Sequence, residues 1–162
     1  MKSKLFFCIV SIFCLFSQLE AKDYPLNINN LIDTATNQNK QILIFFHMDH
    51  CGYCKRMEKR VFKNTEIQNN LKKNFLFVDI NIDDKGTVYF NKKSYSKRDF
   101  AHSVDVDFFP TVLFLDENYD ITYTVRGYRD RRKFKKILQF IQTKSYETID
   151  FFDYEKKYRR EE

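Results

Sequence analysis

Two cysteines separated by two residues, Cys51 and Cys54, lie in the stretch HMDHCGYC, which spans residues 47–54. Such a pair could form a redox-active dithiol, a structural disulfide or, with its neighbours, a metal site. A disulfide between these two residues would enclose too little chain to restrain the unfolded state much. A purely structural role is therefore disfavoured, and redox chemistry and metal binding remain.

The metal alternative has two forms. Tetrahedral zinc could take His47, His50, Cys51 and Cys54, whereas copper(I) would favour Met48 with the two cysteines. Structural zinc sites usually draw their ligands from two segments far apart in the sequence, but these candidates lie within eight residues. A copper- or zinc-binding module stays open as the second alternative, and we assign no metal ligand.

The redox interpretation fits the spacing better. A cysteine in the first turn of a helix has its thiolate stabilised by free backbone N–H groups and by the helix dipole. We therefore predict that Cys51 is the exposed nucleophile and that Cys54, one turn later, resolves the mixed disulfide. His50 and Lys55 add positive charge nearby, which is expected to lower the pKa of Cys51 further.

The first residues have the pattern of a secretory signal peptide. Lys2 and Lys4 precede an interrupted apolar run at residues 5–19, and the small residue Ala21 follows. The run is short for a transmembrane helix, which needs about 20 apolar residues, although an uncleaved anchor is the alternative. We expect residues 1–21 to be removed and the protein to be periplasmic if the organism is a Gram-negative bacterium.

Removal of this leader would leave Cys51 and Cys54 as the only cysteines, whereas a disulfide scaffold normally has several bridges. The net charge of +6 is modest and spread along the chain, so nucleic-acid binding is not expected. The remaining length is that of one domain. We assign residues 22–145 to it and residues 146–162 to a C-terminal helical extension.

Hydrophobic periodicity predicts the elements along this domain. Strands are expected at 41–46, 75–82, 111–115 and 121–125. Helices are expected at 26–38, 55–62, 96–103, 134–141 and 146–158, and a further helical turn is expected to begin at Thr65 as its cap. Strands that alternate with helices indicate an α/β fold, with a central mixed, largely parallel sheet covered by helices on both faces. The last two strands should form an antiparallel hairpin, followed by a helix.

The order of these elements carries a resemblance. A buried strand, then Cys51-Gly-Tyr-Cys54 and a helix, then Phe109-Pro110-Thr111 opening a hairpin, and Gly127 before a final helix resemble the thioredoxin superfamily. The resemblance spans residues 28–141, and within the superfamily it is nearest to exported bacterial proteins of the SoxW and DsbD C-terminal-domain group. It implies a thioredoxin-like fold and a thiol–disulfide oxidoreductase with a Cys51–Cys54 disulfide in its oxidised form.

The resemblance also implies a substrate groove. Pro110 would be a cis-proline facing the cysteines, which exposes the backbone of the preceding residue so that a substrate strand can pair with it. The groove residues expected on this basis are Gly52, Tyr53, Phe109, Pro110, Arg126 and Gly127.

Three features depart from the thioredoxin pattern. Phe45 stands where thioredoxins carry a buried acid, and Asp79 is a candidate to replace that acid, the alternative being an exposed strand-edge aspartate. The Gly-Tyr dipeptide is similar to that of periplasmic disulfide isomerases, but there is no room for their dimerisation domain. Residues 86–95 are an addition, either a substrate-facing loop or a surface hairpin.

The expected function is thus that of an exported reductase of substrate disulfides. An oxidase or an isomerase is the first alternative. No organic cofactor is implied, because the two sulfurs carry the electrons. By resemblance, the partners would be cysteine-containing exported proteins, with apocytochrome c a candidate, and a membrane thiol electron transporter that recharges the protein. We expect a monomer.

Overall fold

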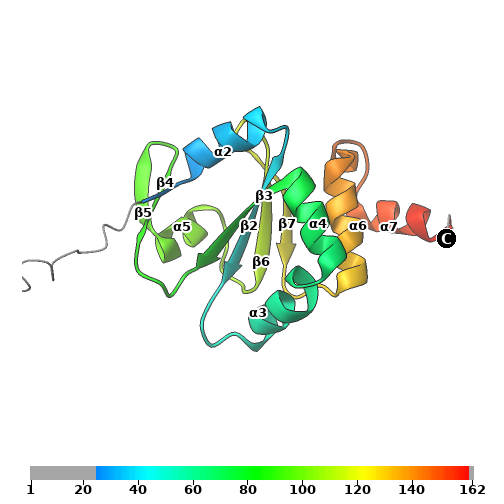
Figure 1. Cartoon of the computed structure of the whole chain (residues 1–162), viewed down its shortest axis with the longest axis horizontal. Helices are drawn as coiled ribbons and strands as arrows, with labels where there is room; N and C mark the ends of the chain where they lie inside the picture. Colours follow the sequence, from blue (N-terminus) through cyan, green and yellow to red (C-terminus); the bar gives the residue numbers. More distant parts are fainter. Residues whose placement is uncertain (1–24, 161–162) are drawn as a thin grey trace, which may run out of the picture.

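A four-stranded mixed sheet forms the centre of the molecule (Figure 1). The computed structural model describes residues 25–160, so the expected leader lies outside the described residues. The strand order is β3 (Phe75–Asn81), β2 (Gln41–His47), β6 (Thr111–Leu115) and β7 (Ile121–Arg126). Strands β2 and β3 are parallel, whereas β6 is antiparallel to both β2 and β7. The predicted mixed sheet is confirmed, but the expectation that it is largely parallel is wrong. In the described central sheet the β2–β3 pair is parallel and the other two pairs are antiparallel, because β6 runs against both of its neighbours.

Strand β2 is central because it can be buried on both faces. Its residues 42–46 are all apolar and fully covered, and the cysteine pair follows four residues after the strand ends. Strand β6 is likewise buried along its whole length. The site is therefore anchored to the two least accessible strands.

Helices cover both faces of this sheet, as expected. One core cluster holds α2 (Ile28–Asn37) and α5 (Lys97–Ser103) against the sheet. The other holds α3 (Gly52–Met57), the π-helical turn η2 (Glu58–Phe62), α4 (Thr65–Asn74) and α6 (Arg131–Gln142). The helix expected at 55–62 therefore begins earlier, at Gly52, and becomes π-helical from Glu58. The N-cap of α4 is Asn64 and not the expected Thr65, because the Asn64 Oδ1 accepts a hydrogen bond from the Ile67 N–H.

A second, three-stranded sheet lies beside α5. In it β4 (Thr87–Phe90) pairs with β1 (Leu26–Asn27) on one side and with β5 (Lys93–Ser96) on the other. The added segment 86–95 thus forms a hairpin. The helix expected from residue 26 begins at Ile28, because the two residues before it belong to β1.

The C-terminal extension is two elements rather than the single helix expected at 146–158. A 3-10 turn, η3 (Ser145–Glu147), is followed by α7 (Phe151–Arg160). Phe151 packs on Phe140 of α6, with ring centroids 5.4 Å apart.

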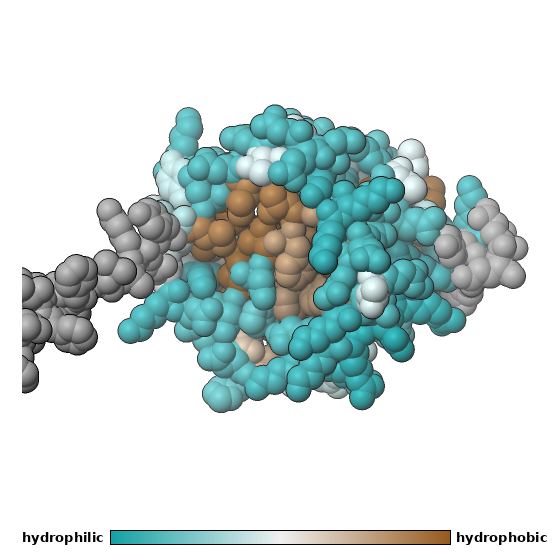
Figure 2. All heavy atoms as spheres, in the orientation of Figure 1, coloured by the Kyte–Doolittle hydropathy of each residue, from teal (hydrophilic) through white to brown (hydrophobic). Residues whose placement is uncertain are grey.

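Most of the face in Figure 2 is hydrophilic, but apolar side chains reach the surface in its middle, beside β3. Within residues 25–160, no helix is both long and apolar enough to cross a membrane.

Candidate functional site

Cys51 and Cys54 are joined by a disulfide at the start of α3, with their Cα atoms 5.2 Å apart. Cys51 is the N-cap residue, and its Sγ accepts a hydrogen bond from the Cys54 backbone N–H at 3.0 Å. Cys51 is partly exposed, whereas Cys54 is 0% exposed. Of the two residues, Cys51 is thus the one that solvent can contact, and the roles of nucleophile and resolving thiol stay a prediction.

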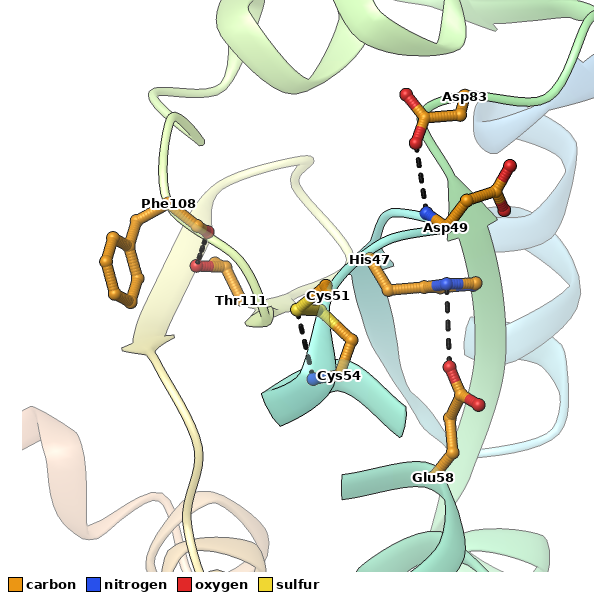
Figure 3. Close-up of a disulfide and its surroundings, with 8 residues drawn as sticks. All are labelled: His47, Asp49, Cys51, Cys54, Glu58, Asp83, Phe108 and Thr111. Carbon is orange, nitrogen blue, oxygen red and sulfur yellow. Dashed lines mark hydrogen bonds and ion pairs between the residues drawn. A yellow bond between two sulfur atoms is a disulfide. The ribbon is translucent and has the colours of Figure 1, made fainter. Parts of the chain in front are cut away.

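The loop before β6 lies opposite the disulfide (Figure 3). The Phe109–Pro110 peptide bond is cis, and Pro110 is buried. The loop is held on both sides of the proline: the Thr111 hydroxyl donates to the Phe108 carbonyl at 2.6 Å, and the Gly127 N–H donates to the Pro110 carbonyl at 2.7 Å. The structure thus brings together the end of β7 and the proline loop, as the groove predicted from sequence requires.

Two exposed aromatic side chains belong to this region. Tyr53, between the cysteines, is 63% exposed, and Phe108 is 60% exposed. Tyr53 lies 6.3 Å from the ring of Tyr128, and the guanidinium of Arg56 stacks over that same ring at 4.8 Å. Phe108 and Tyr128 were not predicted from the sequence. The one available signal was their position, since Phe108 directly precedes Phe109-Pro110 and Tyr128 follows Gly127.

Gly127 is the one groove position where the backbone requires glycine. Its φ is +85°, a left-handed conformation that side chains disfavour, and a Cβ there would lie 3.4 Å from the Phe108 ring. The neighbouring Arg126 is exposed, and its guanidinium donates to the Asp105 carbonyl at 3.4 Å. Gly52 is exposed, with open space around its Cα.

A second cluster lies behind the cysteine helix. The Nε2 of His47 lies 2.7 Å from the Asp79 carboxylate, and its Nδ1 lies 3.5 Å from the carboxylate of Glu58, which follows Cys54 by one helical turn (Figure 3). Burial lowers the pKa of His47, but the hydrogen bond to Asp79 and the charges of Asp79 and Glu58 outweigh it, so the pKa is raised. His47 therefore has two acidic partners.

The expected tuning residues lie at different depths. Asp79, the candidate for the missing buried acid, has a side chain that is 58% exposed and engaged with His47. His50 and Lys55 are exposed, and among the described residues neither forms a salt bridge or a side-chain hydrogen bond. Their influence on the Cys51 thiolate stays a prediction. Glu58 was not predicted from the sequence.

The zinc ligand set considered from the sequence is not brought together. Both ring nitrogens of His47 face carboxylates, and its ring points away from the cysteines (Figure 3). Across residues 25–160, no group of three or more His, Cys, Asp or Glu side chains is placed to hold a metal ion.

Residues 28–142 match the family described as "Thioredoxin-like domain". The chain belongs to this family. The superfamily expected from the motifs is thereby confirmed, and the fold and the bonded cysteine pair are those of thiol–disulfide oxidoreductases.

Among curated proteins, the chain is 23% identical to Anterior gradient protein 3 of the mouse (Mus musculus). The match covers 57% of this chain and only 48% of the mouse protein. Among solved structures, a thioredoxin-fold protein from Helicobacter pylori is similar at a TM-score of 0.61 and 24% identity, over 75% of this chain and 81% of that one. The reduced DsbD C-terminal domain of Neisseria meningitidis is similar at a TM-score of 0.52 and 16% identity, over 69% and 91%. These structural similarities concern the fold.

Proposed function

We propose that this protein is an exported thiol–disulfide oxidoreductase that reduces disulfides in other exported proteins. The observation that carries the proposal is the unequal exposure of the two bonded cysteines. The partly exposed Cys51 can exchange with a substrate, and the fully covered Cys54 lies within bonding distance to complete the exchange.

The reaction begins with the reduced pair. The Cys51 thiolate attacks one sulfur of a substrate disulfide, so that a mixed disulfide forms and the other substrate sulfur leaves as a thiolate. Cys54 then loses its proton and attacks the Cys51 sulfur, which releases the second substrate thiolate. Two electrons pass from the protein to the substrate, and the Cys51–Cys54 disulfide of the described structure is the product.

The reductase direction rests on the resemblance to the DsbD C-terminal-domain group. A reductase in an oxidising compartment must be recharged by a dithiol donor, and a membrane thiol electron transporter is the proposed source. Cysteine-containing exported proteins, apocytochrome c among them, are the proposed substrates. The same steps run in reverse would donate a disulfide, so an oxidase or isomerase is the alternative.

The reduction potential of the Cys51–Cys54 pair tests the direction. After equilibration in glutathione buffers, a value near that of thioredoxin, roughly −270 mV, supports a reductase. A value near that of DsbA, roughly −120 mV, supports a disulfide donor instead. The absence of a reversible couple contradicts the redox function itself.

Export has its own test. The proposal rests on the basic and apolar pattern of residues 2–21. N-terminal sequencing of the protein recovered from the periplasm of a Gram-negative host should give a first residue near Lys22. An intact N-terminus in the membrane fraction indicates an anchor, and an intact chain in the cytoplasm contradicts export.

A further inference from the structure

The strand β3 ends the central sheet with an open side. The Ile82 N–H donates to the His47 carbonyl at 2.9 Å, so the backbone of alternate residues before it faces β2. The N–H and C=O groups of the residues between, Phe75, Phe77 and Asp79, therefore face outward. Within residues 25–160 no strand pairs with this edge, and the short strand β1 pairs with β4 in the second sheet.

An open groove of about 630 Å³ runs along this edge, and we call it the β3 groove. It lies between β3, η2 and α4, and its floor is aromatic: Phe45 packs on Phe62 at 4.7 Å, and Phe62 on Phe77 at 5.1 Å. Phe77 remains 38% exposed. This is where Figure 2 shows apolar side chains at the surface. An exposed, apolar edge strand is a template for pairing with another strand.

Lysines and carboxylates line different parts of the β3 groove, and Lys63, which follows η2, adds a further positive charge to its lining. Lys40 lies at one end, since it precedes Gln41, the partner of Phe75 in the β2–β3 register, and Lys72 lies beside it near the end of α4. Among the described residues neither lysine forms a salt bridge. Asp79 and Glu58 line the other end, where both face His47.

We propose that the β3 groove binds a second copy of this chain, through antiparallel pairing of β3 with β3 about a two-fold axis at Phe77. This register sets Phe75 of one copy opposite Asp79 of the other, so the lysine end of each groove meets the acidic end of its partner. The two Phe77 rings become direct cross-strand neighbours. The outward N–H and C=O groups of both strands are satisfied at the same time.

The charge pattern favours this occupant over others. A parallel arrangement would bring lysines against lysines. The segment at residues 1–24 lies outside the described residues, and its first 21 residues have the pattern of a signal peptide that is removed, so it is not the proposed occupant. The sequence predicts a monomer. The open edge of β3 follows from the pairing of β1 with β4, which the local sequence pattern does not show.

The mass in solution tests the dimer. Light scattering coupled to gel filtration, on the full chain as its host leaves it, should give twice the mass of one chain. Phe77→Glu should give a monomer, because two carboxylates would meet at the axis. The matched control is Ile121→Glu on β7, the opposite edge strand, where Ile121 is 42% exposed. This control should remain dimeric.

Charge reversal tests the register, and it uses an exposed helix residue that folding tolerates. Lys72→Glu should weaken the dimer by roughly tenfold, since each reversal acts twice in a two-fold interface. Adding Asp79→Lys to the same chain should restore it. Hydrogen exchange at the Phe77 and Asp79 amides should be slow in the dimer and fast in Phe77→Glu.

Three outcomes overturn the proposal. They are a monomeric wild type at high concentration, dissociation by Ile121→Glu but not by Phe77→Glu, and slow exchange at Phe77 in a monomer, which would show the edge covered by the chain's own first residues. The proposal is independent of the redox function. Disulfide reductase turnover of Phe77→Glu, which leaves Cys51 untouched, separates loss of the dimer from loss of the active site.

Discussion

His47 and Asp79 form an ion pair across the parallel strands β2 and β3, with Nε2 of the imidazole 2.7 Å from the carboxylate. They are diagonal neighbours on one face of the sheet, because the register places Asp79 opposite Phe45, two residues before His47. With its side chain 58% exposed, Asp79 is not a buried acid but an exposed strand-edge aspartate, the alternative considered from the sequence, and it is the charged partner of the mostly covered His47. The pair links the strand that leads to the cysteines with the exposed edge of the sheet.

Removing this partner should lower the pKa of His47. Asp79→Asn deletes the charge that holds the pKa of His47 above its ordinary value. A group whose pKa is raised on folding stabilises the protein fully below its unfolded pKa, and this stabilisation is lost as the pH rises through the folded pKa. The free energy of unfolding of the variant should therefore fall below that of the wild type at pH 5, and the difference should shrink by pH 9.

NMR titration of the His47 ring measures this shift directly, and His102, which pairs with Asp107 elsewhere, is the internal control. The stability difference should stay below about 1 kcal/mol, because Asp79 is largely exposed. An unchanged His47 titration in Asp79→Asn would show that the ion pair does not form in solution.

The pattern of the sequence was sufficient for the central sheet but not for this pair. The apolar runs of β2 and β6 are buried on both faces, so their composition alone marks them as strands. The register of parallel strands joined by a helical crossover is not encoded in either strand. The contact between His47 and Asp79 follows from that register, and the role of Glu58 follows from the helix beyond Cys54.

The strand β1 escaped prediction for a different reason, and the hairpin of β4 and β5 was predicted as one of two alternatives for residues 86–95. The strand β5 reads Lys-Ser-Tyr-Ser and is mostly exposed, so it has no apolar alternation to detect, and β1 is two residues long. Backbone hydrogen bonds to β4 hold both of them. The N-cap of α4 shows the same limit on a smaller scale, since Asn64 and Thr65 are both good caps and the tertiary structure selects the first.

The two cysteines should respond differently to replacement by serine. Cys51→Ser removes the accessible sulfur and should abolish insulin reduction. Cys54→Ser leaves the nucleophile but removes the resolving thiol, so mixed disulfides with substrates should accumulate. Non-reducing gels followed by mass spectrometry of the adducts distinguish the two variants. Equal adduct yield from Cys51→Ser would reverse the roles that the exposures of the two residues indicate.

The exposed aromatic residues beside the site should act on substrate binding rather than on stability. Phe108→Ala and Tyr53→Ala each remove an apolar surface that a substrate segment can contact, since both side chains are at least 60% exposed. The KM for a protein disulfide substrate should rise about three- to tenfold, with kcat changed much less. Phe152→Ala, an equally exposed phenylalanine on α7, should leave both constants unchanged. An equal rise in KM for Phe152→Ala would contradict the assignment of Phe108 and Tyr53 to substrate binding.

The C-terminal extension should be an integral part of the domain, which a pair of adjacent residues can test. Phe151 is half-buried and packs on Phe140 at 5.4 Å and Tyr123 at 6.1 Å, whereas Phe152 is 61% exposed. Phe151→Ala should lower the free energy of unfolding by about 1–3 kcal/mol, because it leaves a gap among these rings. Phe152→Ala should change it by less than about 0.5 kcal/mol. Urea denaturation of both variants provides the comparison. Equal midpoints would mean that α7 does not contribute to the stability of the fold, and the domain would then end near α6.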